Sequence, residues 1–286
     1  MTSAEAEPPF VRIGPAQPKS PVILSVPHAG RDYRAHLLRA ARVPQSALEP
    51  LEDRLADTLV WRATEAGATA FIARVPRAEI DLNREAREID PTMVTPPLQP
   101  EEVIQSARTR GGIGLVPTRI TGLGPIWHGR LPRAELARRI DEIHRPYHEA
   151  LDAALRAARE RFGAAILLDC HSMPPRPEGE AIVVFGDRHG TSTTPPLLDA
   201  ALSAARALGY RTEVNTPYAG GYVVARHGRP MRSIHALQIE IDRTVYLDAE
   251  LRAPGPGFAD ACRLVAAVAD ALAARLLGNE LPLAAE

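Results

Sequence analysis

The order of apolar and polar positions along the chain predicts alternating strands and helices. Short apolar runs predict strands over 21–26, 69–75, 165–170, 181–185, 210–214, 221–225 and 236–241. Helical spacing of apolar residues predicts helices over 53–66, 132–162, 195–208 and 257–277, and Pro146 would bend the second of these. This alternation is typical of an α/β three-layer sandwich, with a mostly parallel or mixed central sheet and helices on both faces.

Local composition divides the chain into segments. Residues 1–20 are rich in proline and polar residues and predict an extended N-terminal segment, whereas residues 279–286 predict a loose C-terminal tail. Between them, residues 21–278 predict a single domain. Within this domain, about residues 85–131 are rich in proline and glycine and show weak periodicity, which predicts an irregular flap or insertion outside the sheet.

Composition excludes several classes of protein. With 286 residues, 45% hydrophobic and 24% charged, the chain is an ordinary soluble one, and its net charge of -1 favours neither nucleic acid nor membrane surfaces. No apolar run approaches the ~18 residues of a membrane span. The first residues do not resemble a signal peptide, and Cys170 and Cys262 lie in a predicted strand and helix, which argues against a disulfide. We expect a cytoplasmic protein that acts on a small molecule.

Two predicted strands lead into histidines. The strand over 165–170 runs through Asp169 to His171, and residues two apart share one face of a strand. His28 follows the strand over 21–26, and open α/β sheets bind ligands beyond the carboxyl ends of their strands. A carboxylate beside a histidine commonly holds one ring nitrogen while the other binds a metal. The two histidines therefore predict a metal site, with hydrogen-bonded structural histidines as the alternative.

A third metal ligand has to come from another segment. Zinc in a hydrolytic site takes three protein ligands and keeps one position for water. The acidic cluster between residues 49 and 57 supplies Asp53 as the candidate, with Glu52 as its substitute. Alternatively, Asp53 caps the helix that is predicted to begin there.

Glu240 lies between two isoleucines of the strand predicted over 236–241. Burying an unpaired carboxylate is costly, so Glu240 should face a cation, a metal site or Arg243. In an active site it would suit the role of general base. The alternative is a strand on which Gln238, Glu240 and Asp242 all face solvent.

Other segments offer less specific candidates. Asn83 and Arg84 lie in a polar loop, and Gly220 and Gly221 would permit a ligand to approach the backbone closely. His144 and His148 have the spacing of a zincin motif, but the glutamate of that motif is missing and Pro146 stands between them, so a metal site there is not favoured. His148 could still reach the pocket from a neighbouring helix, whereas the sequence gives His128 and His227 no role.

Six segments, in order, resemble the N-formylglutamate amidohydrolase family, which is similar to zinc carboxypeptidase-type hydrolases. The matching segments are SVPHAGRDY (25–33), LEDRLAD (51–57), DLNR (81–84), LLDCHSMP (167–174), NTPYAGGY (215–222) and ALQIEIDRTVYLD (236–248). The resemblance implies a zinc carboxypeptidase-like fold. The His-x-x-Glu pair of the carboxypeptidases is missing, because Arg31 stands three residues after His28.

The resemblance also implies roles for residues of this chain. One zinc ion per chain, or another divalent metal, would be held by His28, Asp53 and His171. Glu240 would activate water and Asp169 would orient His171. Substrate contacts would come from Arg84 and Arg243 as carboxylate clamps, and from Asn83, Asn215, Gly220 and Gly221.

The implied activity is hydrolysis of the amide bond of an N-formyl or small N-acyl acidic amino acid. N-formyl-L-glutamate, giving L-glutamate and formate, is the leading candidate. Two alternatives stay open on the sequence. One is a deacylase for a different N-acyl compound, and the other is a non-catalytic α/β protein that binds a metal or a carboxylate.

Overall fold

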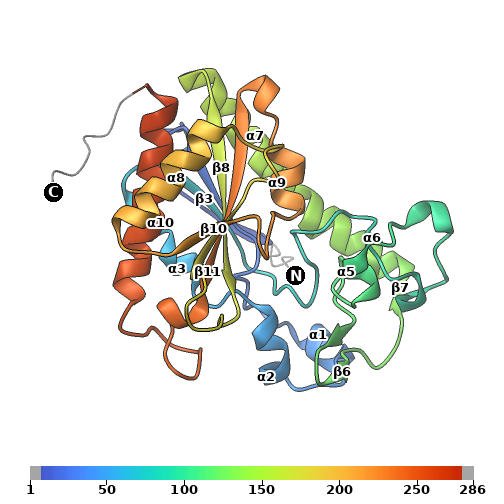
Figure 1. Cartoon of the computed structure of the whole chain (residues 1–286). Coiled ribbons are helices and arrows are strands. Elements are labelled where there is room, and N and C mark those ends of the chain that lie inside the picture. The colour runs from blue at the N-terminus through green and yellow to red at the C-terminus, as the bar shows by residue number, and fades with distance from the viewer. Residues whose placement is uncertain (1–7, 279–286) are drawn as a thin grey trace, which may run out of the picture.

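The computed structural model describes residues 8–278, which form a seven-stranded sheet with helices on both faces (Figure 1). The strand order is β1-β3-β2-β8-β11-β9-β10. The strands are β1 (Phe10–Ile13), β2 (Val22–Val26), β3 (Thr69–Ala73), β8 (Ala165–Met173), β9 (Val183–Gly186), β10 (Thr212–Val214) and β11 (Ile234–Asp242). β1 lies within the predicted N-terminal segment, and the predicted tail over 279–286 lies outside the described residues.

The sheet is mixed but mostly parallel. β3, β2, β8 and β11 run parallel, so their carboxyl ends meet at one edge. β1 is antiparallel to β3, and β9 is antiparallel to β11 but parallel to β10. The predicted α/β class with helices on both faces is confirmed.

The helices form the two outer layers (Figure 1). The short helices α3 (Ala56–Leu59) and α4 (Trp61–Glu65) lie with α8 (Pro195–Ala207) and α10 (Phe258–Leu276) over one face. The other face is covered by α7 (Arg145–Phe162) and α9 (Tyr222–His227). Each layer closes its own apolar core, because successive residues of a strand point to opposite faces.

Because of this alternation, polar side chains of β8 and β11 point toward the layer formed by α7 and α9. In β8, Leu167 belongs to the core under α7 and α9, whereas Leu168 and Cys170 belong to the opposite core. Asp169 and His171 therefore continue the face of Leu167. In β11, Gln238 pairs with Asp169 and Glu240 pairs with His171. Two adjacent strands thus present a row of polar groups at their carboxyl ends.

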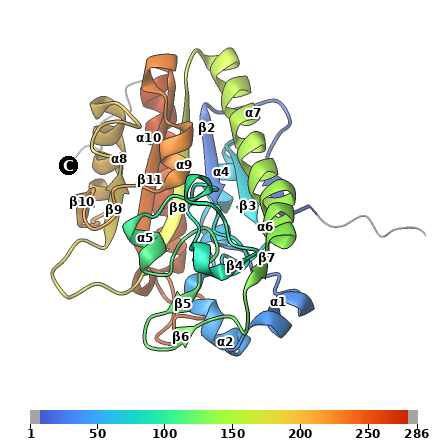
Figure 2. The same cartoon turned by 90° about the vertical axis from the view of Figure 1, so that its right-hand side faces the viewer.

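Residues 85–131 contain only short elements. They are η2 (Pro91–Met93), β4 (Val94–Thr95), η3 (Pro100–Glu102), α5 (Ala107–Arg110), β5 (Arg119–Ile120) and β6 (Gly124–Pro125). With α1 (Ala35–Ala40), α2 (Gln45–Leu48) and β7 (Leu131–Pro132), they gather at one end of the molecule (Figure 2). The remaining short helices are η1 (Glu49–Leu51), η5 (Pro230–Arg232) and η6 (Arg243–Val245).

Three predicted elements differ from the structure. The strand predicted over 221–225 is wrong: the segment forms α9, and Val223, Val224 and His227 are buried at helical spacing. The helix predicted over 53–66 is divided, because Leu55 adopts a left-handed conformation with φ 61° before α3. The long helix over 132–162 consists of α6 (Arg133–Arg139), a π-helical segment (Ile140–His144) and α7, and Pro146 lies in the first turn of α7, where its missing N–H is tolerated.

Within residues 8–278, none of the helices combines the length and the apolar character that crossing a bilayer requires.

The position of β8 between the two cores predicts a large cost for truncating Leu168, which is 0% exposed. Leu168→Ala should lower the free energy of unfolding by about 2–5 kcal/mol, measured by urea denaturation. Met231→Ala is the control, because Met231 is 99% exposed and its truncation should change stability by about 0.5 kcal/mol or less. Equal losses in the two variants would contradict the central position of β8.

Candidate metal centre

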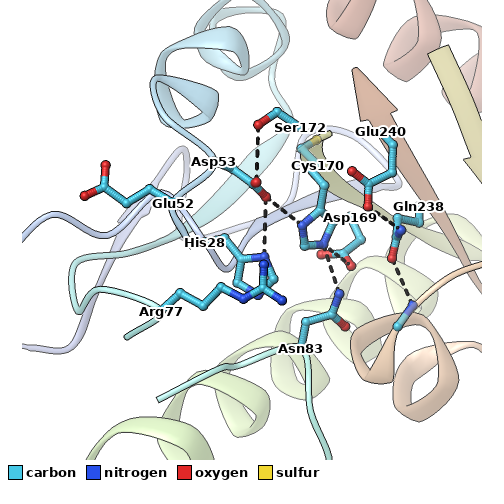
Figure 3. A network of polar contacts seen from close by, with 12 residues as sticks. His28, Glu52, Asp53, Arg77, Asn83, Asp169, Cys170, Ser172, Gln238 and Glu240 are labelled. Atoms are coloured by element: carbon cyan, nitrogen blue, oxygen red, sulfur yellow. Dashed lines mark hydrogen bonds and ion pairs between the residues drawn. The ribbon is translucent and has the colours of Figure 1, made fainter. Parts of the chain in front are cut away.

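His28, Asp53 and His171 form a buried cluster at the carboxyl edge of the parallel strands. Figure 3 labels His28 and Asp53, with Asp169 and Glu240 nearby. Their donor atoms all lie within 4.8 Å of one another. Oδ2 of Asp53 is 2.9 Å from Nδ1 of His171 and 3.4 Å from Nδ1 of His28. The three residues are 2–3% exposed. The sequence thus identified three side chains that the fold brings together from β8 and from the segments after β2 and before α3.

A buried carboxylate holds the other nitrogen of each histidine. Nε2 of His28 lies 2.8 Å from Oδ1 of Asp81, and Nε2 of His171 lies 2.9 Å from Oδ2 of Asp169. Since a carboxylate accepts, Asp81 and Asp169 place a hydrogen on Nε2 of each ring. Nδ1 of each ring faces Asp53, and a metal bound there would take the Nδ1 lone pair in place of a hydrogen. Two imidazole nitrogens and one carboxylate oxygen form a donor set that zinc takes in hydrolytic enzymes, so these residues fit a metal.

Asp53 does not cap a helix. The residue before α3 is Leu55, and no side chain caps that helix. Instead, Oδ1 of Asp53 accepts from Oγ of Ser172 at 3.2 Å and from Nη2 of Arg243 at 3.3 Å. Burial raises the pKa of Asp53, but hydrogen bonds to His171 and His28 lower it, and the pKa lies well below its ordinary value. Asp53 is therefore a carboxylate available to a metal at neutral pH.

Glu52, the alternative ligand, points away from the cluster (Figure 3). Its Oε1 accepts from the hydroxyl of Tyr33 at 2.6 Å, and its Oε2 pairs with Arg54 at 3.2 Å. Both carboxylate oxygens already have partners on that side of the backbone. The geometry thus favours Asp53 over Glu52 as the carboxylate of the centre.

A cavity of about 290 Å³ opens onto the cluster. This volume lies at the lower end of the ~300–1,000 Å³ that is typical of small-molecule sites. Its walls combine the cluster with Glu240 and four arginines, and the lining residues that bear on the argument are Arg77, Asn83, Arg84, Arg108, Tyr218, Gly220, Gly221, Gln238, Glu240 and Arg243. The site therefore suits a small anionic compound.

Glu240 contributes to this cavity a carboxyl group that lies outside the His-Asp-His cluster. It is 8% exposed, and its Oε1 accepts from Nε2 of Gln238 at 2.8 Å. Burial raises the pKa of Glu240 to about 7, while His171 opposes the shift and Asp53 adds to it. A group with this pKa can accept and return a proton at neutral pH. The alternative of a solvated strand face is wrong, because Gln238, Glu240 and Asp242 are all buried.

The two arginines that the sequence suggested as clamps use most of their donors within the protein. Arg84 donates from Nε to the carbonyl of Ile113 and from Nη1 to the carbonyl of Asn83, both at 2.8 Å. Arg243 donates to Ser172 and to the carbonyls of Pro50 and Glu52. Both line the cavity, but their contacts mainly hold its walls together.

Two other arginines keep donors for a ligand, and the sequence did not identify them. Arg77 donates from Nε to Asp81 at 2.8 Å, which leaves the two Nη groups without a protein acceptor among the described residues. Arg108, on α5, is exposed, and its side chain makes no hydrogen bond or ion pair within residues 8–278. Arg108 could not be found from the sequence, because it lies in the segment that lacks periodicity.

Asn83 and the glycine loop form the remaining wall. Nδ2 of Asn83 lies 3.1 Å from Nε2 of His171, and its Oδ1 accepts from the N–H of Val223 at 2.8 Å. Gly221 has to be glycine, because a Cβ there would lie 2.2 Å from the Asn83 amide. Asn215 is not part of the lining: its side chain is hydrogen-bonded to Asp187 instead.

Comparisons with known proteins identify the family of this chain. The family model described as N-formylglutamate amidohydrolase matches residues 20–247. The chain belongs to this family. N-formylglutamate deformylases of Pseudomonas putida and Pseudomonas aeruginosa are 30% and 29% identical to it over 240 residues, which cover 81% and 80% of this chain and 84% and 83% of theirs.

Solved structures extend the likeness to the fold. The crystal structure of N-formylglutamate amidohydrolase from Ralstonia eutropha JMP134 matches with a TM-score of 0.84 and 35% identity, covering 91% of this chain and 95% of that one. A protein from Agrobacterium tumefaciens shares the fold at a TM-score of 0.61 and 18% identity, covering 93% and 95%. The resemblance of the six sequence motifs to this family is thus confirmed.

A second group of potential ligands lies apart from this family site. His36, Glu79 and Glu135 also bring donor atoms within 4.8 Å of one another. However, Glu135 already pairs at 2.8 Å with both Arg138 and Arg139, so cations that belong to the protein occupy its carboxylate. The His28–Asp53–His171 cluster is therefore the stronger metal candidate.

Measurements of zinc affinity distinguish between the two groups of potential ligands. We expect metal-depleted protein to bind one Zn²⁺ per chain with high affinity in a calorimetric titration, and His171→Ala to abolish this binding. Asp169→Asn should weaken it by about 10- to 100-fold, because it removes the carboxylate that holds Nε2 of His171. His36→Ala is the control and should leave the affinity unchanged. Loss of binding in His36→Ala, with His171→Ala unaffected, would contradict this assignment.

Proposed function

We propose that this protein is a zinc-dependent deformylase that hydrolyses N-formyl-L-glutamate to L-glutamate and formate. The observation that carries the proposal is one small cavity that unites the His-Asp-His cluster, the buried carboxyl group of Glu240, and arginine donors without an acceptor among residues 8–278. The names of the relatives from the two Pseudomonas species support the same substrate.

The metal would be held by Nδ1 of His28, Nδ1 of His171 and Oδ2 of Asp53. When bound, zinc would supply the Lewis acidity that activates water and polarises a carbonyl at neutral pH. Asp81 and Asp169 keep both rings in the tautomer that such binding requires. Ser25 in turn donates to Oδ1 of Asp169 at 2.7 Å and fixes that carboxylate.

Glu240 would move the protons of the reaction. It would accept a proton from the water that attacks the formyl carbon, and then pass it to the amide nitrogen as the C–N bond breaks. Gln238 holds Oε1 of Glu240 and orients the carboxyl group. Burial of Glu240 raises its pKa and so favours the uptake of a proton.

The arginines would recognise the two carboxylates of the substrate. Arginine binds a carboxylate through two parallel hydrogen bonds, and these charge-assisted bonds are stronger than neutral ones. Arg77 and Arg108 line the cavity and keep donors free for this purpose, whereas Arg84 and Arg243 contribute charge from the walls. A dianionic N-formyl amino acid thus matches both the size and the charge of the site.

Turnover measurements test the proposal. Zinc-loaded protein should hydrolyse N-formyl-L-glutamate faster than N-acetyl-L-glutamate, N-succinyl-L-glutamate or N-formyl-L-leucine. Glu240→Gln should reduce kcat by about 10²- to 10⁴-fold while the bound zinc stays unchanged. A preference for another acyl group would indicate a different deacylase. Zinc binding without hydrolysis of any of these compounds, or full activity in Glu240→Gln, would overturn the proposal.

Arg108 allows a second test, because a matched arginine lies on the same helix. Arg108→Gln should raise the KM for N-formyl-L-glutamate about tenfold or more, since hydrogen bonds to charged groups contribute about 1.5–3 kcal/mol. Arg110→Gln is the control, because Arg110 lies outside the cavity lining and donates to the carbonyl of Gln105. Identical KM values in the two variants would remove Arg108 from the substrate site.

A further inference from the structure

Three buried histidines lie behind the loop that carries Asn83, and the mechanism above uses none of them. His144 ends the π-helical segment, His148 follows one turn later in α7, and His227 ends α9. They are 4%, 1% and 1% exposed. Burying polar rings is unfavourable unless their nitrogens find partners, so the contacts of these histidines indicate what they hold in place.

His144 and His148 reach the two carbonyls on either side of Asn83. Nε2 of His148 lies 2.9 Å from the carbonyl oxygen of Leu82, and Nε2 of His144 lies 2.8 Å from that of Arg84. Burial lowers the pKa of both rings, so each is neutral and carries one ring hydrogen. A carbonyl only accepts, which places that hydrogen on Nε2 in both residues.

The helix is irregular at the point where these rings lie. The π-helical segment ends at His144, and such segments occur frequently at functional sites. The rings of His144 and His148 are 4.5 Å apart and both pack against the ring of Tyr222 from α9. The two donors are therefore held side by side and face the same loop.

A further contact orients His148 from behind. Its Nδ1 lies 3.0 Å from Nε2 of His227, whose Nδ1 lies 3.1 Å from Oδ1 of Asp152. His227 thus supports His148 but makes no hydrogen bond or ion pair with the loop over residues 81–84.

Asn83 links this arrangement to the metal centre. Its side-chain amide lies 3.1 Å from Nε2 of His171 and accepts the N–H of Val223. Its backbone carbonyl accepts from Nη1 of Arg84, whose guanidinium lines the cavity. The carbonyl of Leu82 belongs to the peptide unit that enters Asn83, and the carbonyl of Arg84 belongs to the unit that follows Arg84. Fixing both carbonyls therefore restrains the loop on either side of the Asn83–Arg84 pair, whose Asn83 side chain touches His171.

We propose that His144 and His148 are positioning residues, which clamp the carbonyls of Leu82 and Arg84 and so hold Asn83 against His171. The effect on turnover rests on the proposed deformylase function, whereas the effect on the loop does not. A displacement of about 1 Å in a supporting group can lower activity 10²-fold. The clamp thus gives a role to a histidine pair that lacks the glutamate of a zincin motif.

Three variants test the clamp through kinetics. His148→Phe keeps the ring volume but removes the donor to Leu82, and it should lower kcat/KM about tenfold or more. His227→Phe is the matched control: it removes an equally buried histidine of the same cluster, and its loss should be clearly smaller. His148→Gln retains an N–H donor and should restore most of the activity. Equal losses in His148→Phe and His148→Gln would overturn the clamp.

Amide hydrogen exchange provides a readout that is independent of turnover. The N–H of Asn83 donates to Asp81, and those of Tyr222 and Val223 donate to Asn83. His148→Phe should accelerate exchange at these three amides, whereas His148→Gln should leave them close to the wild-type rates and His227→Phe should have a smaller effect. If His148→Phe does not fold, His144→Phe makes the same comparison through Arg84.

The two readouts separate the two proposals. A wild-type protein without turnover would overturn the deformylase function, and the exchange rates would still decide the clamp. Unchanged exchange at Asn83, Tyr222 and Val223 in the phenylalanine variants would overturn the clamp, whatever the substrate proves to be.

Discussion

The structure depends on the concentration of buried carboxylates at the carboxyl edge of the parallel strands. Asp53, Asp81 and Asp169 are each 0–2% exposed and surround the rings of His28 and His171. Uncompensated charge of this density is strongly unfavourable inside a protein. Arg77 neutralises Asp81 and Arg243 approaches Asp53, and a divalent cation between the two Nδ1 atoms would compensate the remaining charge. The binding of such a cation would be linked to folding as well as to chemistry.

The pairing register of the strands places these polar groups at one edge of the sheet. Ser25, Asp169 and Gln238 lie in one row across β2, β8 and β11, and His171 and Glu240 lie in the next. Because residues two apart share a face, the same strands that fill the core under α7 and α9 carry these groups into the site. The helices of that layer then hold the loop of Asn83 from behind, so packing and active-site geometry are set by the same contacts.

The sequence revealed those parts of the site that follow from local pattern. His28, His171 and Glu240 could be predicted because each continues or directly follows an apolar strand. The sequence left open whether Asp53 caps a helix. Leu55 adopts a left-handed conformation before α3, which excludes that role, but residue spacing does not reveal such a turn. α9 was mistaken for a strand because two valines favour strands locally, whereas its burial pattern depends on contacts with α7. The sequence did not identify Arg77 and Arg108, because a free donor is recognised only when the acceptors around it are known.

A metal bound between the two Nδ1 atoms and Oδ2 of Asp53 would complete this site. Anomalous diffraction at the zinc absorption edge, from crystals of zinc-loaded protein, measures where the metal binds. We expect one strong peak within bonding distance of Nδ1 of His28, Nδ1 of His171 and Oδ2 of Asp53, with Nε2 of each ring still on Asp81 and Asp169. A peak between His36, Glu79 and Glu135 instead, or zinc bound through Nε2 of either histidine, would contradict this expectation.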